Sequence, residues 1–131
     1  MLLKIYRSFT YAIAGLWHAI RTERNLKMVI LFILGGFILA VILQIALWEW
    51  IILIIASGTV CAVELINTSL ERFADAFEHH AKKIDDPTHY HLMKATKDVA
   101  AAAALVSGSA AIFAAIIIFW PYLTEFVVSS L

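Results

Sequence analysis

Four polar side chains follow one another at helical spacing in the middle of the sequence. Glu64, Asn67, Glu71 and Asp75 lie within VELINTSLERFAD, residues 63–75, which closes a long apolar run. Their spacings of three, four and four residues place them on one face of a helix. Carboxylate and amide oxygens suit Mg²⁺ together with substrate phosphates, and a carboxylate can also accept a proton from a hydroxyl. The row therefore indicates phosphoryl transfer, in which positioning and electrostatics dominate.

Glu64 is the deepest of these groups in the apolar run. Counted from Trp48, where a membrane span is predicted to begin, it lies about 16 residues along, or about 24 Å at ~1.5 Å per residue. An ionisable side chain inside the bilayer is costly and usually functional. For Glu71 and Asp75 alone, acids that merely reach from a helix end into water explain the pattern equally well.

Two more polar groups are predicted to reach the same membrane level. Glu23 precedes the first apolar block in RTERNLK, and Lys97 with Asp98 opens the last one in KATKDVAAAAALVSGSAA. The lysine would neutralise phosphate charge beside carboxylates that hold Mg²⁺. Neither a GxxxxGK[ST] loop nor a protein-kinase signature occurs, which excludes the two common nucleotide-binding folds.

Membrane-spanning helices must position these groups. Of 131 residues, 63% are hydrophobic and only 15% charged, far from the balance of a soluble domain. The apolar blocks 28–63 and 99–131 contain one acid each, Glu49 and Glu125. Because a crossing needs about 20 apolar residues, the first block suffices for two spans and the second for one. We predict a single all-α membrane domain over residues 1–131, with spans near 28–46, 48–70 and 98–121.

The basic residues predict the orientation of these spans. All ten Lys and Arg lie in residues 1–27 or 72–97. Short segments rich in Lys and Arg remain in the cytoplasm, so the N-terminus and a loop over residues 72–97 should be cytoplasmic and the C-terminus outside. The outer turn is predicted around residues 44–50, where Gln44, Glu49 and two tryptophans lie, and Trp120 to Tyr122 mark the outer end of the third span.

Residues 4–22 are predicted to form an amphipathic helix on the membrane surface, with basic residues off its apolar face. That face recurs at steps of three and four residues: Ile5, Phe9, Ile13, Leu16, Trp17 and Ile20.

The segment after the second span is predicted to continue it as a polar helix over residues 72–83, until Asp85, Asp86 and Pro87 break it. Four histidines lie between Asp75 and Lys97, and a transition-metal site is an alternative role for them. With no i, i+4 pair and no cysteine beside them, a solvated loop is favoured. The histidines are His79, His80, His89 and His91.

ELINTSLERFAD followed by KATKDVAAAAALV resembles the signature of the small bacterial membrane lipid kinases, the prokaryotic diacylglycerol kinase and undecaprenol kinase family. The upstream SFTYAIAGLWHAIRTERN is similar to the family's N-terminal helix and the glutamate before its first span. The ERN triplet is closer to the undecaprenol branch. The loop rich in histidine is longer than is usual in the family.

The resemblance implies a fold, an activity and a set of roles. It implies a homotrimer in the bacterial inner membrane and Mg²⁺-dependent transfer of the ATP γ-phosphate to a lipid alcohol, diacylglycerol or undecaprenol. No nucleic acid is expected as a partner. Glu64 would be the general base and contact the lipid substrate, with Asn67 on the catalytic face. Glu23 and Glu71 would hold Mg²⁺ and the nucleotide, and the other nucleotide-binding residues would be Asp75, Lys97, Asp98, Lys4 and Arg7.

Two other functions remain open on the residues alone. One is a non-enzymatic membrane scaffold whose acids close helix contacts. The other is an ion or proton pathway along the Glu64 row, although the outer halves of the spans contain almost no polar residues. Three spans also give a thin protomer, so Glu64 and Asn67 are expected to need a second subunit to cover them.

Overall fold

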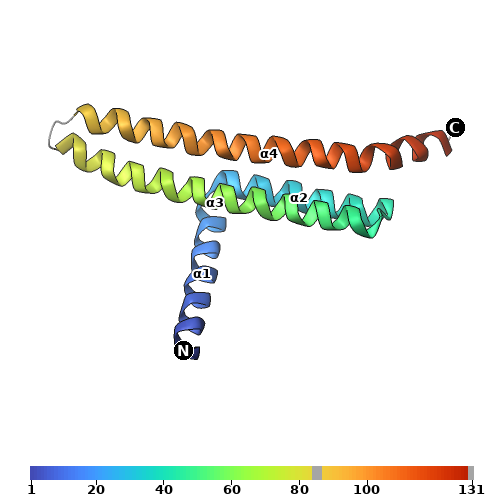
Figure 1. The fold of residues 1–131 in the computed structure, drawn as a ribbon, viewed down its shortest axis with the longest axis horizontal. Coiled ribbons are helices and arrows are strands. Elements are labelled where there is room, and N and C mark those ends of the chain that lie inside the picture. The colour runs from blue at the N-terminus through green and yellow to red at the C-terminus, as the bar shows by residue number, and fades with distance from the viewer. Residues whose placement is uncertain (84–86, 130–131) are drawn as a thin grey trace.

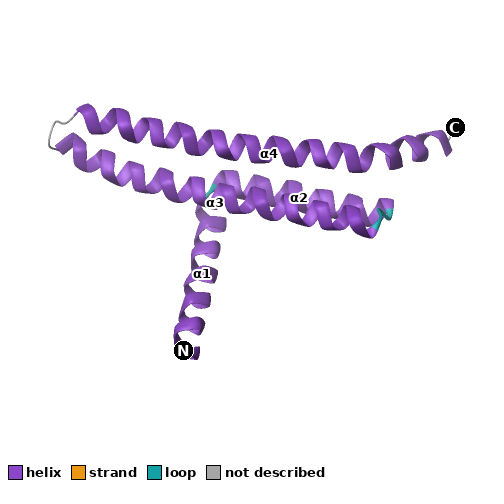
Figure 2. Cartoon of the chain, in the orientation of Figure 1, coloured by secondary structure: helices purple, strands orange, loops and turns teal. Residues whose placement is uncertain are grey.

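The structure is a computed structural model that describes the backbone of residues 1–83 and 87–129 and the side chains of residues 1–79 and 90–128. The described backbone consists of four helices and short connections, with no strand (Figure 2). Three of these helices are long and apolar enough to cross a membrane. The predicted all-α membrane fold is therefore confirmed. The helices are α1 (Leu2–Thr22), α2 (Arg24–Leu43), α3 (Leu47–Lys83) and α4 (Pro87–Ser129).

The helices form a narrow bundle with one arm. α3 and α4 run antiparallel and pack along their length, α2 lies beside α3, and α1 leaves the bundle at a steep angle (Figure 1). The C-terminal end of α4 lies at the end of the bundle where α2 turns into α3. If α2 to α4 cross the bilayer, α1 runs roughly along its plane, as a surface helix would. Its apolar face has no cover within the chain, since Ile5, Phe9 and Ile13 are all exposed.

Glu23 forms the corner between α1 and α2. Its extended backbone (φ −93°, ψ 120°) ends one helix and begins the next. The Glu23 N–H donates to the Ala19 carbonyl at 2.8 Å, and the Lys27 N–H donates to the Glu23 carbonyl at 3.3 Å. Both helix ends are thus satisfied through one residue, which fixes the point from which the Glu23 side chain projects.

The lengths of the helices differ in a way that matters for the site. α2 has 20 residues, about 30 Å at ~1.5 Å per residue, which matches the ~30 Å hydrocarbon core. α3 and α4 have 37 and 43 residues, about 55 and 65 Å by the same rise. Both extend past the start of α2 (Figure 1). We call residues 67–83 of α3 and 87–98 of α4 the polar extension.

The described residues of the predicted cytoplasmic connection 72–97 are all helical; residues 84–86, which include the predicted break at Asp85 and Asp86, lie outside the described residues. The predicted polar helix over 72–83 is present, and Pro87 stands at the first position of α4, where its missing N–H costs nothing. Within the extension Ala74 is fully buried, whereas Phe73 and Phe77 are exposed on α3 with their ring centroids 6.2 Å apart. Packing at Ala74 contributes to keeping this charged segment helical.

The turn between α2 and α3 is shorter than the predicted 44–50, because α3 already begins at Leu47. Gln44 adopts the left-handed conformation with φ 51°, usual for glycine, and its N–H bonds the Val41 carbonyl. Glu49 reaches back to accept the Ala46 N–H at 2.8 Å, a capping-box contact, and the Tyr122 hydroxyl donates to the same carboxylate. Glu49 is buried by this arrangement and is a structural cap.

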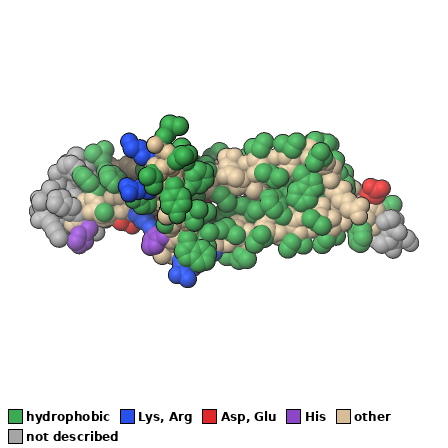
Figure 3. All heavy atoms as spheres, turned by 90° about the horizontal axis from the view of Figure 1, so that it is seen from below, with side chains coloured by type: hydrophobic (Ala, Val, Ile, Leu, Met, Phe, Trp, Pro, Cys, Tyr) green, Lys and Arg blue, Asp and Glu red, His purple; other side chains and the backbone are tan. Residues whose placement is uncertain are grey.

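The apolar core lies toward this turn, away from the polar extension. Ile45, Leu53, Ile118 and Phe119 are buried there together with Ala40. α4 continues past the predicted end of the third span at residue 121 and runs to Ser129 with a proline inside it. Space-filling Figure 3 shows apolar side chains over this part of the bundle, while basic side chains gather near α1.

Candidate active site

The predicted polar row lies on one unbroken helix. Measured around the α3 axis at ~100° per residue, Glu71 and Asp75 each lie within about 20° of Glu64, on opposite sides of it, and Asn67 lies about 60° from Glu64. Exposure rises along the row: Glu64 and Asn67 are 7% and 4% exposed, Glu71 is half-buried and Asp75 is exposed. The row thus leads from the interior of the bundle to the surface.

The burial of Glu64 and Asn67 corrects one expectation. A single protomer covers both side chains, because α3 is flanked by α2 and α4 at this level. Their burial therefore gives no reason to require a second subunit. The sequence argument failed because it treated the protomer as three thin rods and did not allow for the close approach that small residues such as Ala100 on α4 permit.

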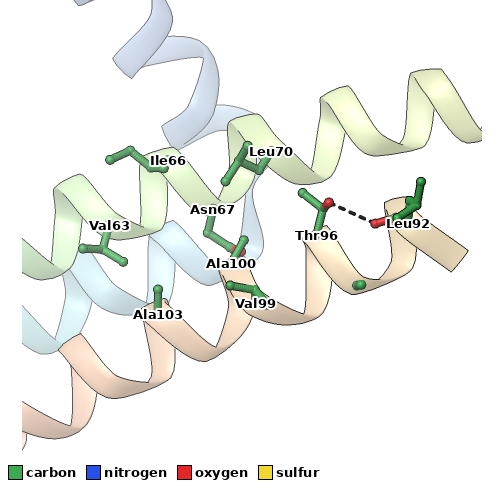
Figure 4. Close-up of a pocket in the computed structure, with 10 residues that line it drawn as sticks. Val63, Ile66, Asn67, Leu70, Leu92, Thr96, Val99, Ala100 and Ala103 are labelled. Carbon is green, nitrogen blue, oxygen red and sulfur yellow. Dashed lines mark hydrogen bonds between the residues drawn. The ribbon is translucent and has the colours of Figure 1, made fainter. Parts of the chain in front are cut away.

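Asn67 links the row to a groove between α3 and α4. Its Nδ2 donates to Glu71 Oε1 at 3.0 Å, while its Oδ1 is buried without a hydrogen-bond partner among the described residues. Figure 4 shows the side chain pointing from α3 toward Ala100 on α4. The groove is open and has a volume of about 510 Å³. Asn67 supplies a side-chain amide to the lining of this groove. The rest of the lining is mostly apolar and includes Val63, Ile66, Val99 and Ala103. An unpaired buried acceptor is costly, which marks it as a place for a donor from a ligand.

Glu64 lies on the side of α3 that faces α2, whereas Asn67 faces α4. The side chain of Asn25 interacts with its carboxyl group, and Glu71 and Glu23 are near enough for their charges to act on it. Three carboxylates from the corner and from α3 therefore lie in one electrostatic neighbourhood. A cation or a proton is needed to offset the repulsion among such groups.

Glu23 is held to α3 by Arg72. The guanidinium Nε donates to Glu23 Oε1 at 3.2 Å, and Nη2 donates to the same oxygen and to Thr22 Oγ1. The side chains of Arg72 and Glu23 are 44% and 26% exposed. This ion pair holds Glu23 against α3, the helix that carries the polar row. The sequence had predicted that Glu23 and the row lie at the same membrane level.

Lys97 joins α4 to the outer part of the row. Its Nζ donates to Asp75 Oδ1 at 2.9 Å and to Glu78 Oε2 at 3.2 Å. Asp98, the next residue, is exposed and has no hydrogen bond or ion pair with another described residue. The structure thus brings Lys97 and Asp75 together but leaves Asp98 apart from both.

Lys4 and Arg7 are not brought to the site within the protomer. Both are exposed near the free end of α1, which points away from the bundle (Figure 1). Along the helix, Lys4 is about 28 Å from Glu23 at ~1.5 Å per residue.

A preformed metal cluster is not apparent in the part of the chain that the structure describes: no three His, Cys, Asp or Glu side chains group there as ligands. His79 and His91 are exposed, and the His91 ring contacts Tyr90. The side chains of His80 and His89 lie outside the described residues.

Three contributing residues escaped sequence reasoning: Asn25, Arg72 and Glu78. Arg72 is three residues before Asp75, and Glu78 is three residues after it, so helical spacing could have placed both near the outer end of the row. Nothing in the sequence indicated that Arg72 would pair with Glu23 across 49 residues. Asn25 stands in the ERN triplet, two residues after Glu23.

A second, largely apolar groove of about 750 Å³ runs along α2, α3 and α4 nearer the α2–α3 turn. Its walls include the small residues Gly36, Ser57 and Gly108, with Phe32 and Trp120 at its sides. The surface is suited to contact with apolar chains.

Comparisons with known proteins agree with the resemblance in the motifs. The sequence model of the prokaryotic diacylglycerol kinase family matches residues 10–119. The undecaprenol kinase of Bacillus subtilis (strain 168) is 32% identical over 120 residues, which cover 92% of this chain and 91% of that protein. No solved structure matches the chain.

Proposed function

We propose that this chain, which belongs to the prokaryotic diacylglycerol kinase family and is a lipid kinase, transfers the γ-phosphate of ATP to the hydroxyl of undecaprenol in the bacterial inner membrane. Diacylglycerol is the second candidate acceptor. The undecaprenol choice rests on the similar Bacillus subtilis protein and on the ERN triplet of this sequence.

The observation that carries the proposal is the buried Asn67 with its unpaired Oδ1 beside the buried Glu64. A lipid hydroxyl has one proton and an apolar tail. The groove between α3 and α4 offers a mostly apolar wall with the Asn67 amide in it, and Glu64 lies three residues before Asn67 on α3, on the side toward α2. A scaffold protein would gain nothing from an unsatisfied acceptor, which only costs stability.

The residues suggest how the transfer proceeds. Glu64 removes the proton from the lipid hydroxyl as the oxygen attacks the γ-phosphorus. The bond from phosphorus to the bridging β,γ-oxygen breaks, ADP leaves with that oxygen, and Glu64 later releases its proton to water. Lys97 is placed to offset charge on the departing phosphates.

Mg²⁺ fits the carboxylates at this site. Glu23 and Glu71 each use Oε1 in a hydrogen bond, and neither Oε2 has a partner among the described residues. Two carboxylates completed by phosphate oxygens and water make an ordinary Mg²⁺ environment, so three clustered protein ligands are not required. When bound there, Mg²⁺ would neutralise phosphate charge. Asp75, Lys97 and Asp98 would bind the nucleotide farther out.

The orientation and the assembly belong to the same proposal. The polar extension and α1 face the cytoplasm, where ATP is found, and the α2–α3 turn faces outward, as the positions of all ten basic residues favour. The protein acts as a homotrimer. Lys4 and Arg7, too far from Glu23 in their own protomer, contact the nucleotide of a neighbour.

Phosphate transfer by the purified protein tests this function. The protein in detergent micelles with Mg²⁺ and γ-labelled ATP should label undecaprenol more efficiently than diacylglycerol, as kcat/KM for each lipid measures. Labelling of diacylglycerol alone would reverse the order of the two acceptors. If no lipid alcohol is labelled while the protein is folded, the kinase assignment is wrong for this chain.

A further inference from the structure

Arg72 has no part in the phosphoryl transfer proposed above, although its side chain makes several contacts at the site. Its Nε and Nη2 both contact a single oxygen of Glu23, Oε1, and Nη2 also contacts the Thr22 hydroxyl. The Thr22 hydroxyl in turn bonds the His18 carbonyl at 2.9 Å, which ties it to the last turn of α1. The guanidinium of α3 is therefore fixed to the α1–α2 corner at two points.

The pairing leaves the other carboxylate oxygen open. Glu23 Oε2 has no hydrogen-bond partner in the part of the chain that the structure describes, whereas Oε1 accepts from Nε and Nη2 of Arg72. Among the described residues, the hydrogen bonds from Arg72 are the contacts across helices that hold the Glu23 carboxylate. Without Arg72 the carboxylate would sample several rotamers, and the entropy of ordering it would be lost on each metal-binding event.

We propose that Arg72 is the positioning residue for Glu23: it holds Oε1 so that Oε2 is directed to the Mg²⁺–nucleotide complex. The inference rests on the proposed role of Glu23 as a metal ligand. Arg72 also supplies a positive charge beside Glu23, at a site proposed to accept an anionic nucleotide. Partners that orient a metal ligand typically change metal affinity about 10- to 100-fold when they are removed.

The ion pair does little for the fold itself. Both side chains are partly exposed, and exposed ion pairs contribute little to stability because water and salt screen them. Lysine is a poor replacement, since its single ammonium cannot contact one carboxylate oxygen through two N–H groups while reaching a hydroxyl. A change at Arg72 should therefore appear in nucleotide binding and not in thermal stability.

The variants Arg72→Gln and Arg72→Lys test the proposal, with Lys94→Gln as control. Lys94 is exposed on α4, carries the same charge and has no partner among the described residues. Two readouts are measured on the full-length protein in micelles: kcat and KM for Mg-ATP in lipid phosphorylation, and Mn²⁺ affinity in the presence of ADP by electron paramagnetic resonance. The second readout needs no turnover.

We expect Arg72→Gln to raise KM and weaken Mn²⁺ binding about 10- to 100-fold, with kcat at saturation changed less than about threefold. Arg72→Lys should fall between it and the wild type, and Lys94→Gln should equal the wild type. Glu23→Gln/Arg72→Gln should be no worse than Glu23→Gln alone, because the arginine acts through the glutamate.

Four results would overturn the role of Arg72. They are an unchanged KM and Mn²⁺ affinity in Arg72→Gln, a further loss in the Glu23→Gln background, loss of the fold in both Arg72 variants, or no Mn²⁺ binding by the wild type. Failure of the kinase assignment gives a different result. In that case the wild type phosphorylates no lipid, but Arg72→Gln still weakens its Mn²⁺ binding in the presence of ADP.

Discussion

Replacing Tyr122 with phenylalanine tests how α3 and α4 are aligned, and this alignment sets the position of every site residue. The Tyr122 hydroxyl donates to Glu49 Oε2 and accepts the Ala46 N–H at 3.2 Å. Glu49 is 5% exposed, so its carboxylate depends on these partners in place of water. The substitution removes one oxygen and leaves the ring, which keeps the loss of packing small.

The expected magnitude follows from the two hydrogen bonds. Hydrogen bonds to charged groups contribute about 1.5–3 kcal/mol in soluble proteins, whereas hydrogen bonds between membrane helices average ~0.6 and reach ~1.7 kcal/mol. The Ala46 N–H keeps its bond to Glu49, so only one charged contact is lost outright. We expect Tyr122→Phe to lower the free energy of unfolding by about 1–2 kcal/mol.

Reversible unfolding in mixed micelles, followed by circular dichroism, gives this value. Tyr11→Phe serves as the control, because Tyr11 is exposed on α1 and has no hydrogen bond among the described residues. In a double-mutant cycle with Glu49→Ala, the two losses should not add, since both remove the same contact. Additive losses, or a Tyr122→Phe variant as stable as wild type, would refute the pairing. Activity should change less than about twofold, because Glu64 is about 22 Å away along α3.

Three other predictions concern the metal, the orientation and the assembly. The alanine variants of Glu23 and Glu71 should need more Mg²⁺ and show a raised KM for ATP; superimposable magnesium titrations would remove both from the ligand set. In a chain without its native cysteine, Leu47→Cys should react with an impermeant thiol reagent in intact cells and Lys94→Cys should not, and the reverse pattern would invert the topology. Arg7→Gln protomers mixed with protomers that lack the proposed base should recover part of the activity, whereas inactive mixed trimers would place all site residues in one protomer.

The sequence predicted the elements that local physical chemistry determines. Three apolar stretches, an amphipathic N-terminal segment and a polar row at helical spacing are all local patterns, and each corresponds to a helix in the structure. The boundaries were less accurate where the signal was weak. The turn at Gln44 contains no glycine, so its extent was misjudged, whereas the polar helix predicted over residues 72–83 ends at Lys83 as expected.

The contacts across helices were beyond local patterns. The pairing of Arg72 with Glu23 depends on how α3 lies against the corner, and the unpaired Oδ1 of Asn67 depends on the close approach of α4. The burial of Glu64 within one protomer was likewise missed. These are packing outcomes, which depend on side chains far apart in the sequence.

Comparing wild type with Glu64→Gln in the transfer of labelled phosphate to undecaprenol tests the central claim most directly. Glutamine keeps the size of the side chain and its interaction with Asn25 but cannot accept the lipid proton. Loss of a general base costs about 10² to 10⁴ in rate. We predict that kcat falls by this factor while the thermal unfolding of the protein stays within a few degrees of wild type. A folded Glu64→Gln protein with near-normal kcat would contradict the account.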